Sequence, residues 1–341
     1  MKLLRKIVIV FVPVYWLITW FYHQVYNFGL LKSTKFNHPV ICVGNLVVGG
    51  TGKTPMIEYL ISVLSNQYKI AVLSRGYKRK TSGFVVADHK ASAEQIGDEP
   101  FQIYGKFKQI IVAVDEQRKR GISRLLNMNN KPQVILLDDA FQHRQVRSGL
   151  NILLTAYNNL YCADMMLPTG NLREPKSGAN RAEVIVVTKC PQDLSADEKQ
   201  NIEKQLRLKA YQSLFFSSIQ YENAIKNERN SIGLNDLIGK DFTLLTGIAN
   251  PTPLVTFLEQ NQMIFEHLEY PDHHFFTSEE LQLLKTKPLI VTTEKDFVRL
   301  KGSLDNHKGL YYLPISIQID FENRFNDIVK TFINTYSSTE A

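Results

Sequence analysis

The chain has 341 residues, 44% of them hydrophobic, and it contains no low-complexity tract. This composition excludes a disordered protein, and the length suggests two folded domains. The net charge of +7 suits an anionic partner such as a phosphate compound, a nucleic acid or a membrane surface, although an unspecialised basic surface fits it as well. Three scattered cysteines without metal-ligand or redox spacing indicate a reducing compartment and structural thiols.

The amino terminus carries an almost continuous apolar run at residues 7–21. The run is shorter than the roughly 20 residues of a spanning helix, and Pro13 interrupts it. Bulky residues at 22–24 argue against signal-peptide cleavage, and basic residues on both flanks favour keeping both ends on the cytoplasmic side. We therefore expect residues 1–30 to form a membrane-interface segment. A single-span anchor and a helix buried in the protein remain the alternatives. The aromatic residues expected near the headgroups are Tyr15, Trp16, Trp20 and Phe21.

From residue 40 onward, apolar runs alternate with helical patterns. The predicted strands are Val40–Val43, Ile70–Leu73, Phe84–Val86, Gln109–Ala113, Val134–Leu137, Asn151–Leu154 and Glu183–Thr188. The predicted helices are Thr54–Asn66, Pro100–Tyr104 and Gln117–Met128. This alternation predicts an α/β fold of the P-loop NTPase type, with a mostly parallel sheet and helices on both faces, over residues 31–219.

A polar, Asn-rich segment at residues 220–241 predicts a hinge, after which the alternation resumes. The strands expected there are Phe242–Leu245, Ile264–Glu269, Leu289–Thr292 and Leu310–Ile317. The helices expected there are Thr252–Asn261, Ser278–Lys285 and Glu322–Tyr336. Residues 242–341 are therefore predicted to form a smaller α/β lobe, with a cleft between the two lobes.

The first predicted strand runs into a glycine-rich loop, VGNLVVGGTGKT at residues 43–54. Glycines let successive backbone N–H groups point into one concavity, and the following helix adds its positive amino-terminal end. In such a loop Lys53 reaches the β- and γ-phosphates, while the Thr54 hydroxyl contacts Mg²⁺. Val47 stands where the pattern G-x-x-x-x-G-K-[ST] has its first glycine. An ordinary glycine turn is the alternative.

Residues 134–139 (VILLDD) have the form of a Walker B strand, whose terminal acid holds Mg²⁺ opposite the phosphate loop. This strand end is followed by Gln142, His143 and Arg144. They are expected to be either site residues or solvated turn residues.

Two further segments carry candidate acid–base groups. Asp98 in GDEP either caps a helix or serves as a general base. His273 in PDHH stands beside a second histidine, which suggests a metal site, although no further ligand at metal-binding spacing supports one. The alternative is an Asp–His pair that relays a proton. The loop at residues 167–175 (LPTGNLREP) is ambiguous by itself.

Eight segments in this order resemble the tetraacyldisaccharide 4′-kinases, the lipid A kinases of Gram-negative bacteria. They run from about Val43 to Asp296 and read VGNLVVGGTGKTP, LSRGYKRK, GDEP, DDAFQHR, LPTGNLREP, TGIANP, DHHFF and TEKD. The resemblance implies ATP-dependent phosphorylation of the 4′-hydroxyl of a tetraacylated glucosamine disaccharide 1-phosphate, in lipid A biosynthesis. It also implies Mg²⁺, a location at the cytoplasmic face of the bacterial inner membrane, and no nucleic-acid or obligate protein partner.

The same resemblance assigns roles by motif. The residues implied to bind ATP are Gly49, Gly50, Thr51, Gly52, Lys53, Thr54, Gln142, His143 and Arg173. The residues implied to form the metal environment are Thr54, Asp138, Asp139 and Glu174. The residues implied to act in catalysis are Lys53, Asp98, Asp139 and His273, with Asp98 as the base that acts with His273.

The main rival is a P-loop GTPase or a partitioning-type ATPase that works as a switch. Partitioning-type ATPases carry a lysine where this chain has Val48, and the GTPases read guanine with N-K-x-D. The nearest strand-end candidate, residues 188–191 (TKCP), lacks both the Asn and the Asp. A nucleic-acid-binding protein has only the net charge in its favour.

Overall fold

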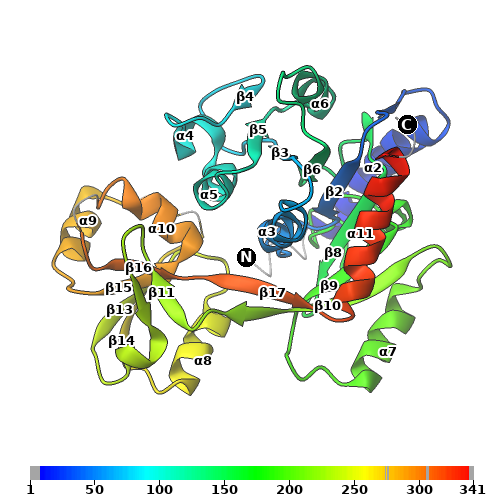
Figure 1. Cartoon of the computed structure of the whole chain (residues 1–341). Helices are drawn as coiled ribbons and strands as arrows, with labels where there is room; N and C mark the ends of the chain where they lie inside the picture. The colour runs from blue at the N-terminus through cyan, green and yellow to red at the C-terminus, as the bar shows by residue number, and fades with distance from the viewer. Residues whose placement is uncertain (1–7, 273, 275, 305–306, 338–341) are drawn as a thin grey trace.

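The computed structural model describes residues 8–272, 274, 276–304 and 307–337. Two α/β lobes of unequal size lie side by side, and a ribbon of two strands runs from one to the other (Figure 1). These strands are β10 (Ser213–Tyr221) and β17 (Ile315–Ile319), which pair antiparallel.

The first lobe contains a nine-stranded sheet with β2 at its centre. Its order is β17, β10, β9 (Val184–Cys190), β8 (Leu150–Ala156), β2 (Val40–Asn45), β6 (Val134–Asp138), β3 (Ile70–Ser74), β5 (Ile111–Val114) and β4 (Val85–Val86). The seven strands from β10 to β5 are parallel to their neighbours, and only the edge strands β17 and β4 run antiparallel. The carboxyl ends of the central strands therefore meet along one edge, where ligands of such sheets bind.

Side chains alternate between the two faces of the sheet along each buried strand. Each face therefore carries apolar side chains, and other segments of the chain cover both faces. One face packs against α3 (Lys53–Leu64), α5 (Asp98–Lys106) and α11 (Glu322–Ser337). The other packs against α6 (Arg118–Leu126), α7 (Ala196–Leu206) and the segment from residue 157 to 182, which includes the 3₁₀ turn η2 (Lys176–Arg181). A short helix, α4 (Ala93–Ile96), precedes α5.

The second lobe is built on a six-stranded sheet. Its order is β12 (Ser231–Gly233), β11 (Ala224–Lys226), β16 (Leu310–Leu313), β15 (Ile290–Thr293), β13 (Phe242–Thr246) and β14 (Phe265–Glu269). One face packs against η3 (Leu234–Leu237) and α8 (Thr252–Gln260), and the other against α9 (Ser278–Lys285) and α10 (Glu294–Lys301).

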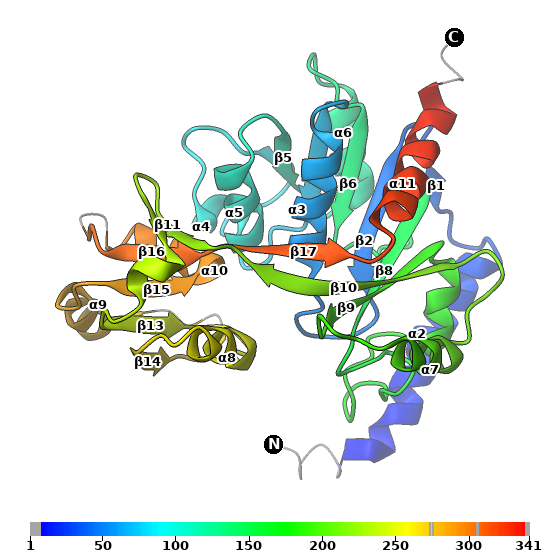
Figure 2. The same cartoon turned by 60° about the horizontal axis from the view of Figure 1, so that its bottom comes forward.

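The amino-terminal segment forms the turn η1 (Val8–Phe11) and the helix α2 (Val12–Asn27), which extends away from the first lobe (Figure 2). The chain then reaches β1 (Thr34–Lys35), which pairs with β7 (Val146–Arg147). In the part of the chain that the structure describes, no helix has the length and apolarity needed to cross a membrane.

The predicted fold class is confirmed: a mostly parallel sheet with helices on both faces and a smaller second α/β lobe. The strand expected over Leu310–Ile317 is two strands in different sheets, because Pro314 lacks an N–H and interrupts the ladder. Sequence patterns missed α7, β10 and α10.

The domain boundaries remain a prediction, and we propose two changes to them. Most of residues 220–241 belongs to the second lobe, because this segment holds β11 and β12 of the second sheet, while β10, which ends at Tyr221, and β17 form the link between lobes. Residues 315–337 return to the first lobe, where Phe325, Val329 and Ile333 of α11 are buried in its core.

This return makes α11 a structural part of the first lobe. Phe325 is fully buried, with its ring edge-on to Phe215 at 5.3 Å between centroids. Phe325→Ala should lower the free energy of unfolding by about 3–5 kcal/mol, because it leaves a cavity in the core. Chemical denaturation measures this, and Phe321→Ala is the control, since Phe321 is 72% exposed and its replacement should cost less than about 0.5 kcal/mol. Equal losses in both variants would contradict the packing described here.

Candidate active site

The phosphate loop joins the carboxyl end of β2 to the start of α3. Gly52 lies directly before the helix at φ +81°, and Gly49 has φ +112°. Side chains rarely adopt such angles, so glycine is needed at both positions for the loop to curl. The amino-terminal end of α3 therefore opens toward the loop, with its unpaired N–H groups available to an anion.

Side chains from neighbouring strand ends hold this loop in shape. Asn45 Nδ2 donates to Thr51 Oγ1 at 2.9 Å, and Thr188 Oγ1 donates to the Thr51 carbonyl at 2.9 Å. Lys189 Nζ donates to the Gly50 carbonyl at 2.6 Å. Thr188 and Lys189 follow the apolar core of β9, so the site draws on a strand that the sequence did not connect with the loop.

The phosphate loop and the Walker B strand converge. Asp138 ends β6, and Asp139 follows it at φ +46°. Lys53 Nζ lies 3.7 Å from Asp139 Oδ1, and Arg173 Nη1 lies 3.4 Å from Asp139 Oδ2. Ser74 at the end of β3 donates to Asp138 Oδ2 at 2.8 Å. One edge of the sheet therefore brings together two carboxylates and two cations.

The two aspartates differ in electrostatic environment. Burial, with the neighbouring charge of Asp139, raises the pKa of Asp138. Burial alone would also raise the pKa of Asp139, but Lys53 and Arg173 outweigh it and hold that pKa below its ordinary range. The Oδ1 atoms of both residues are buried without a hydrogen-bond partner in the described part of the chain. An incoming cation would satisfy both atoms.

Gln142 and His143 lie just beyond the aspartates. Gln142 donates to the Asn45 carbonyl at 2.8 Å and accepts from Arg173 at 3.1 Å, so it links the phosphate loop to Arg173. Burial lowers the pKa of His143 to about 4, and the nearby charge of Arg118 adds to this effect. His143 is therefore neutral at pH 7.

The loop at residues 167–175, ambiguous from sequence, lies against the phosphate loop. Val48 N–H donates to the Asn171 carbonyl at 2.8 Å, and Arg173 N–H donates to the Leu46 carbonyl at 2.8 Å. Val47, which replaces the first glycine of the general pattern, forms a β-bridge with Leu172 and is buried. Val47, where this chain departs from the general pattern, therefore packs between two loops.

Glu174 pairs with basic side chains of its own segment and of the amino-terminal helix. Among the described residues, its carboxylate contacts Arg181, which donates to both oxygens at 2.9 Å, and His23, whose Nε2 lies 2.9 Å from Oε2. His23 belongs to α2, and Tyr15 of the same helix donates to the Arg173 carbonyl at 3.0 Å. The loop that carries Arg173 therefore joins the amino-terminal helix to the phosphate site.

Asp98 begins α5, and its carboxylate faces the second lobe. Arg299 Nε donates to Asp98 Oδ2 at 3.0 Å. The next residue, Glu99, was not predicted as a site residue. Burial raises its pKa to about 7, and the charge of Asp138 contributes to the rise while Lys53 opposes it. Glu99 thus belongs to the electrostatic environment of the aspartates.

His273 lies outside the described residues, so its predicted role is not placed by the structure. Its neighbour Asp272 pairs with Lys295 of α10 at 3.1 Å. His274 lies 2.9 Å from Glu280 in α9, which places this second histidine against its own lobe.

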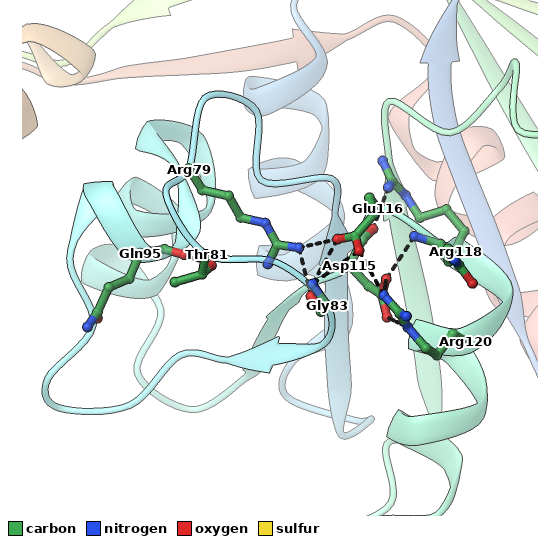
Figure 3. Close-up of polar contacts among 9 residues, drawn as sticks. Arg79, Thr81, Gly83, Gln95, Asp115, Glu116, Arg118 and Arg120 are labelled. Atoms are coloured by element: carbon green, nitrogen blue, oxygen red, sulfur yellow. Dashed lines mark hydrogen bonds and ion pairs between the residues drawn. The ribbon is translucent and has the colours of Figure 1, made fainter.

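The basic loop after β3 is fixed by an acidic residue. Arg79 and Arg120 both pair with Glu116, and the Gly83 N–H donates to it (Figure 3). Hydrogen bonds from its own backbone, from Gly83 and from the two arginines lower the pKa of Glu116 to about 2. Glu116 is therefore ionised at all physiological pH values and holds the loop in place. The loop lies beside Arg118, which donates to the Asp115 and Asp138 carbonyls.

Sequence reasoning missed Asn45, Glu99, Arg118, Thr188 and Lys189. A usable signal exists for Asn45, Thr188 and Lys189, because each stands at the carboxyl end of an apolar strand, where a parallel sheet presents its ligand-binding groups. Arg118 and Glu99 lie on helices, and their nearness to the aspartates depends on helix packing that the sequence pattern does not specify.

Comparison with known proteins identifies the family. The sequence model of the family "Tetraacyldisaccharide-1-P 4'-kinase" matches residues 4–334. The chain is 50% identical over 337 residues to the tetraacyldisaccharide 4'-kinase of Flavobacterium johnsoniae, a match that covers 98% of each chain. It is 44% identical over 334 residues to that of Bacteroides fragilis, covering 91% of this chain and 88% of the relative.

A solved structure agrees with these matches. It is described as the "apo" form of LpxK from Aquifex aeolicus in complex with ATP, and it superposes with a TM-score of 0.78 at 26% identity. The superposition covers 97% of this chain and 99% of the other. These matches do not favour a switch GTPase or a partitioning-type ATPase. On the combined match of sequence, fold and converging nucleotide-site motifs, the chain belongs to the tetraacyldisaccharide 4′-kinase family.

Proposed function

We propose that this chain transfers the γ-phosphoryl group of ATP to the 4′-hydroxyl of a tetraacylated glucosamine disaccharide 1-phosphate, with the residues that converge at Lys53 and Asp139 as its catalytic centre. The approach of Lys53 to Asp139 at 3.7 Å is the single observation that supports this placement best. Family membership makes the protein a phosphotransferase with an alcohol acceptor, in lipid A biosynthesis.

ATP would bind with its phosphates in the loop at residues 49–54. Backbone N–H groups at the start of α3 supply partial positive charge, and Lys53 supplies a full one. Arg173 contacts both Asp139 and Gln142, so its guanidinium lies beside the aspartates, where it can neutralise charge that develops on the transferred phosphoryl group. His143, being neutral, can donate or accept one hydrogen bond without adding charge.

The residues present suit Mg²⁺. The two buried Oδ1 atoms of Asp138 and Asp139 are hard oxygen donors, and Mg²⁺ in such sites is bound by one or two carboxylates together with substrate phosphates. No cluster of three or more His, Cys, Asp or Glu that could hold a metal occurs among the described residues, which is consistent with this mode. We propose Thr54, Asp138 and Asp139 as its ligands. Bound there, Mg²⁺ would neutralise phosphate charge.

We propose a different role for Glu174, because its carboxylate is engaged by Arg181 and His23. It supports the metal environment indirectly, by holding the loop that carries Arg173.

Asp98 is the proposed general base, acting with His273. It would accept the proton of the 4′-hydroxyl as the hydroxyl oxygen bonds to the γ-phosphorus and the bond from that phosphorus to the β,γ-bridging oxygen breaks, leaving ADP. This assignment needs Asp98 to reach across from α5 to an acceptor held between the lobes.

The acceptor is an anionic lipid whose acyl chains stay in a bilayer, so the enzyme must reach a membrane surface. The outer side of α2 suits this: Leu17 is 56% exposed, and Ile18 and Phe21 are each 63% exposed. Trp16 and Trp20 of the same helix line a pocket of about 480 Å³ together with Met165 and Leu172. We propose that α2 lies in the interface of the cytoplasmic leaflet, with basic residues near anionic headgroups.

The activity itself can be tested with γ-labelled ATP and a tetraacyldisaccharide 1-phosphate. The product should carry one added labelled phosphate, and Lys53→Ala should lower turnover by at least about 100-fold, because the transition-state charge loses its nearest cation. Lys69→Ala, at an exposed lysine, is the matched control. Near-normal turnover in Lys53→Ala would remove the loop from the mechanism, and label released only as inorganic phosphate would favour a switch ATPase.

The base assignment predicts a separation of kinetic constants. Asp98→Asn should lower kcat by about 10²–10⁴-fold with the KM for ATP changed less than about threefold, since the amide cannot accept the proton. Glu94→Gln, an exposed position on the neighbouring helix α4, should leave both constants unchanged. A rise in KM alone would assign Asp98 to nucleotide binding instead.

Membrane attachment can be tested without disturbing the contacts of Tyr15 and His23. Replacement of Leu17, Ile18 and Phe21 by Ser should weaken binding to vesicles containing phosphatidylglycerol by more than about 100-fold, because the lost apolar area drives insertion. Vesicle sedimentation measures this. Replacement of Ile238, Ile264 and Phe321 by Ser is the control, since these three residues are exposed to a similar degree and lie outside α2. Undiminished sedimentation of the α2 variant would place the membrane contact on another segment.

A further inference from the structure

Two helices from different lobes pack against each other and are joined by an ion pair at each end. These are α5 of the first lobe and α10 of the second. Glu294, the first residue of α10, pairs with Lys106, the last residue of α5, at 3.2 Å. Arg299, near the end of α10, pairs with Asp98, the first residue of α5, at 3.0 Å. The helices therefore run in opposite directions, with one cross-lobe ion pair at either end.

The pair at Lys106 continues into the phosphate-loop helix. Lys106 Nζ also lies 2.6 Å from Glu58 Oε2, and Glu58 is in α3, the helix that begins with Lys53. Glu58 and Glu294 are both buried. Burial alone would lower the pKa of Lys106, but the two carboxylates raise it above its ordinary value, so the lysine stays charged between them. This ion-pair cluster connects α3, α5 and α10.

The pair at Arg299 continues into the second lobe. Arg299 Nη1 donates to Asp296 Oδ1 at 3.2 Å, and Asp296 Oδ2 accepts from the Gly247 N–H at 2.9 Å. A Cβ on Gly247 would lie 2.9 Å from Asp296 Oδ1, so the close approach requires glycine there. Gly247 and Asp296 belong to the segments TGIANP and TEKD, to which sequence analysis gave no role.

The segment just before the predicted histidine also contacts α10. Lys295 of α10 pairs with Asp272, and the Tyr270 N–H donates to the Thr246 carbonyl at 2.7 Å. The residues after β13, β14 and β15 thus gather at the carboxyl ends of three parallel strands, on the side where α10 meets α5.

We propose that Glu294 and Arg299 are positioning residues that dock the second lobe on both ends of α5 and thereby fix Asp98 relative to the phosphate loop. This inference rests on the proposed function, which makes Asp98 the base. It adds that contacts between the two lobes hold Asp98 in position relative to ATP. Removal of Arg299 would leave the buried carboxylate of Asp296 without its cation, and removal of Glu294 would take away the contact of Lys106 with the second lobe, so the docked arrangement requires both pairs.

Single and double variants, Glu294→Gln, Arg299→Gln and both together, test this with kinetics and amide hydrogen exchange on the full chain. Glu294→Gln leaves Lys106 paired with Glu58, so the first lobe keeps its own contact. We expect kcat to fall by between about 10-fold and 100-fold, with the KM for ATP changed less than twofold, because a misplaced base impairs the chemical step more than nucleotide binding. Exchange should rise in α5 and α10 and remain unchanged in β2 and β6.

Lys301→Gln is the matched control, since Lys301 is in α10 but pairs with Glu228 of its own lobe. It should leave both kcat and exchange in α5 unchanged. Arg299→Lys, which retains the charge, should recover part of kcat.

Unchanged exchange in the double variant would overturn the docking role, and raised exchange with normal kcat would overturn the positioning role. If Asp98→Asn keeps normal turnover while Arg299→Gln lowers kcat and loosens α5, the base assignment fails and the docking of the lobes by α10 stands.

Discussion

The meeting of Lys53 with Asp139 at the carboxyl edge of the first sheet is the constraint that organises this protein. Asp138 is buried and Asp139 is half-buried at the same strand end, where the two carboxylates repel each other, so the site must surround them with cations and hydrogen-bond donors. Lys53, Arg118 and Arg173 provide the charge from three separate segments, and Ser74 provides a hydroxyl. A parallel sheet makes this possible, because the ends of β2, β3 and β6 open onto the same edge.

This edge is connected to the two surfaces on which a lipid kinase depends. Toward the amino-terminal helix, the loop at residues 167–175 binds the phosphate loop through backbone hydrogen bonds and binds α2 through Glu174 and Arg173. Toward the second lobe, α3 and α5 bind α10 through Glu58, Lys106 and Glu294. The proposed lipid-facing helix and the proposed base are therefore both connected to the phosphate site, through different segments.

The ribbon of β10 and β17 gives the two lobes a shared covalent and hydrogen-bonded connection. Because the chain returns through β17 and buries α11 in the first lobe, the second lobe is held between two strands and cannot separate as an independent terminal domain. The ion pairs at α10 then set the lobe orientation at the site, and the ribbon limits how far the lobes can part.

Most of what the sequence determined is local. Glycines at 49, 50 and 52 before a lysine, and two aspartates after an apolar run, identify the phosphate and metal-facing segments because their backbone and charge requirements are met within a few residues. Alternating apolar runs fixed the α/β fold for the same reason, since burial periodicity is a property of each element alone. Only the tertiary structure decided that Glu174 binds His23, that Arg299 binds Asp98 and that β16 and β17 belong to different sheets. These partnerships join residues far apart in the chain, and they depend on how helices and loops pack, which no local pattern encodes.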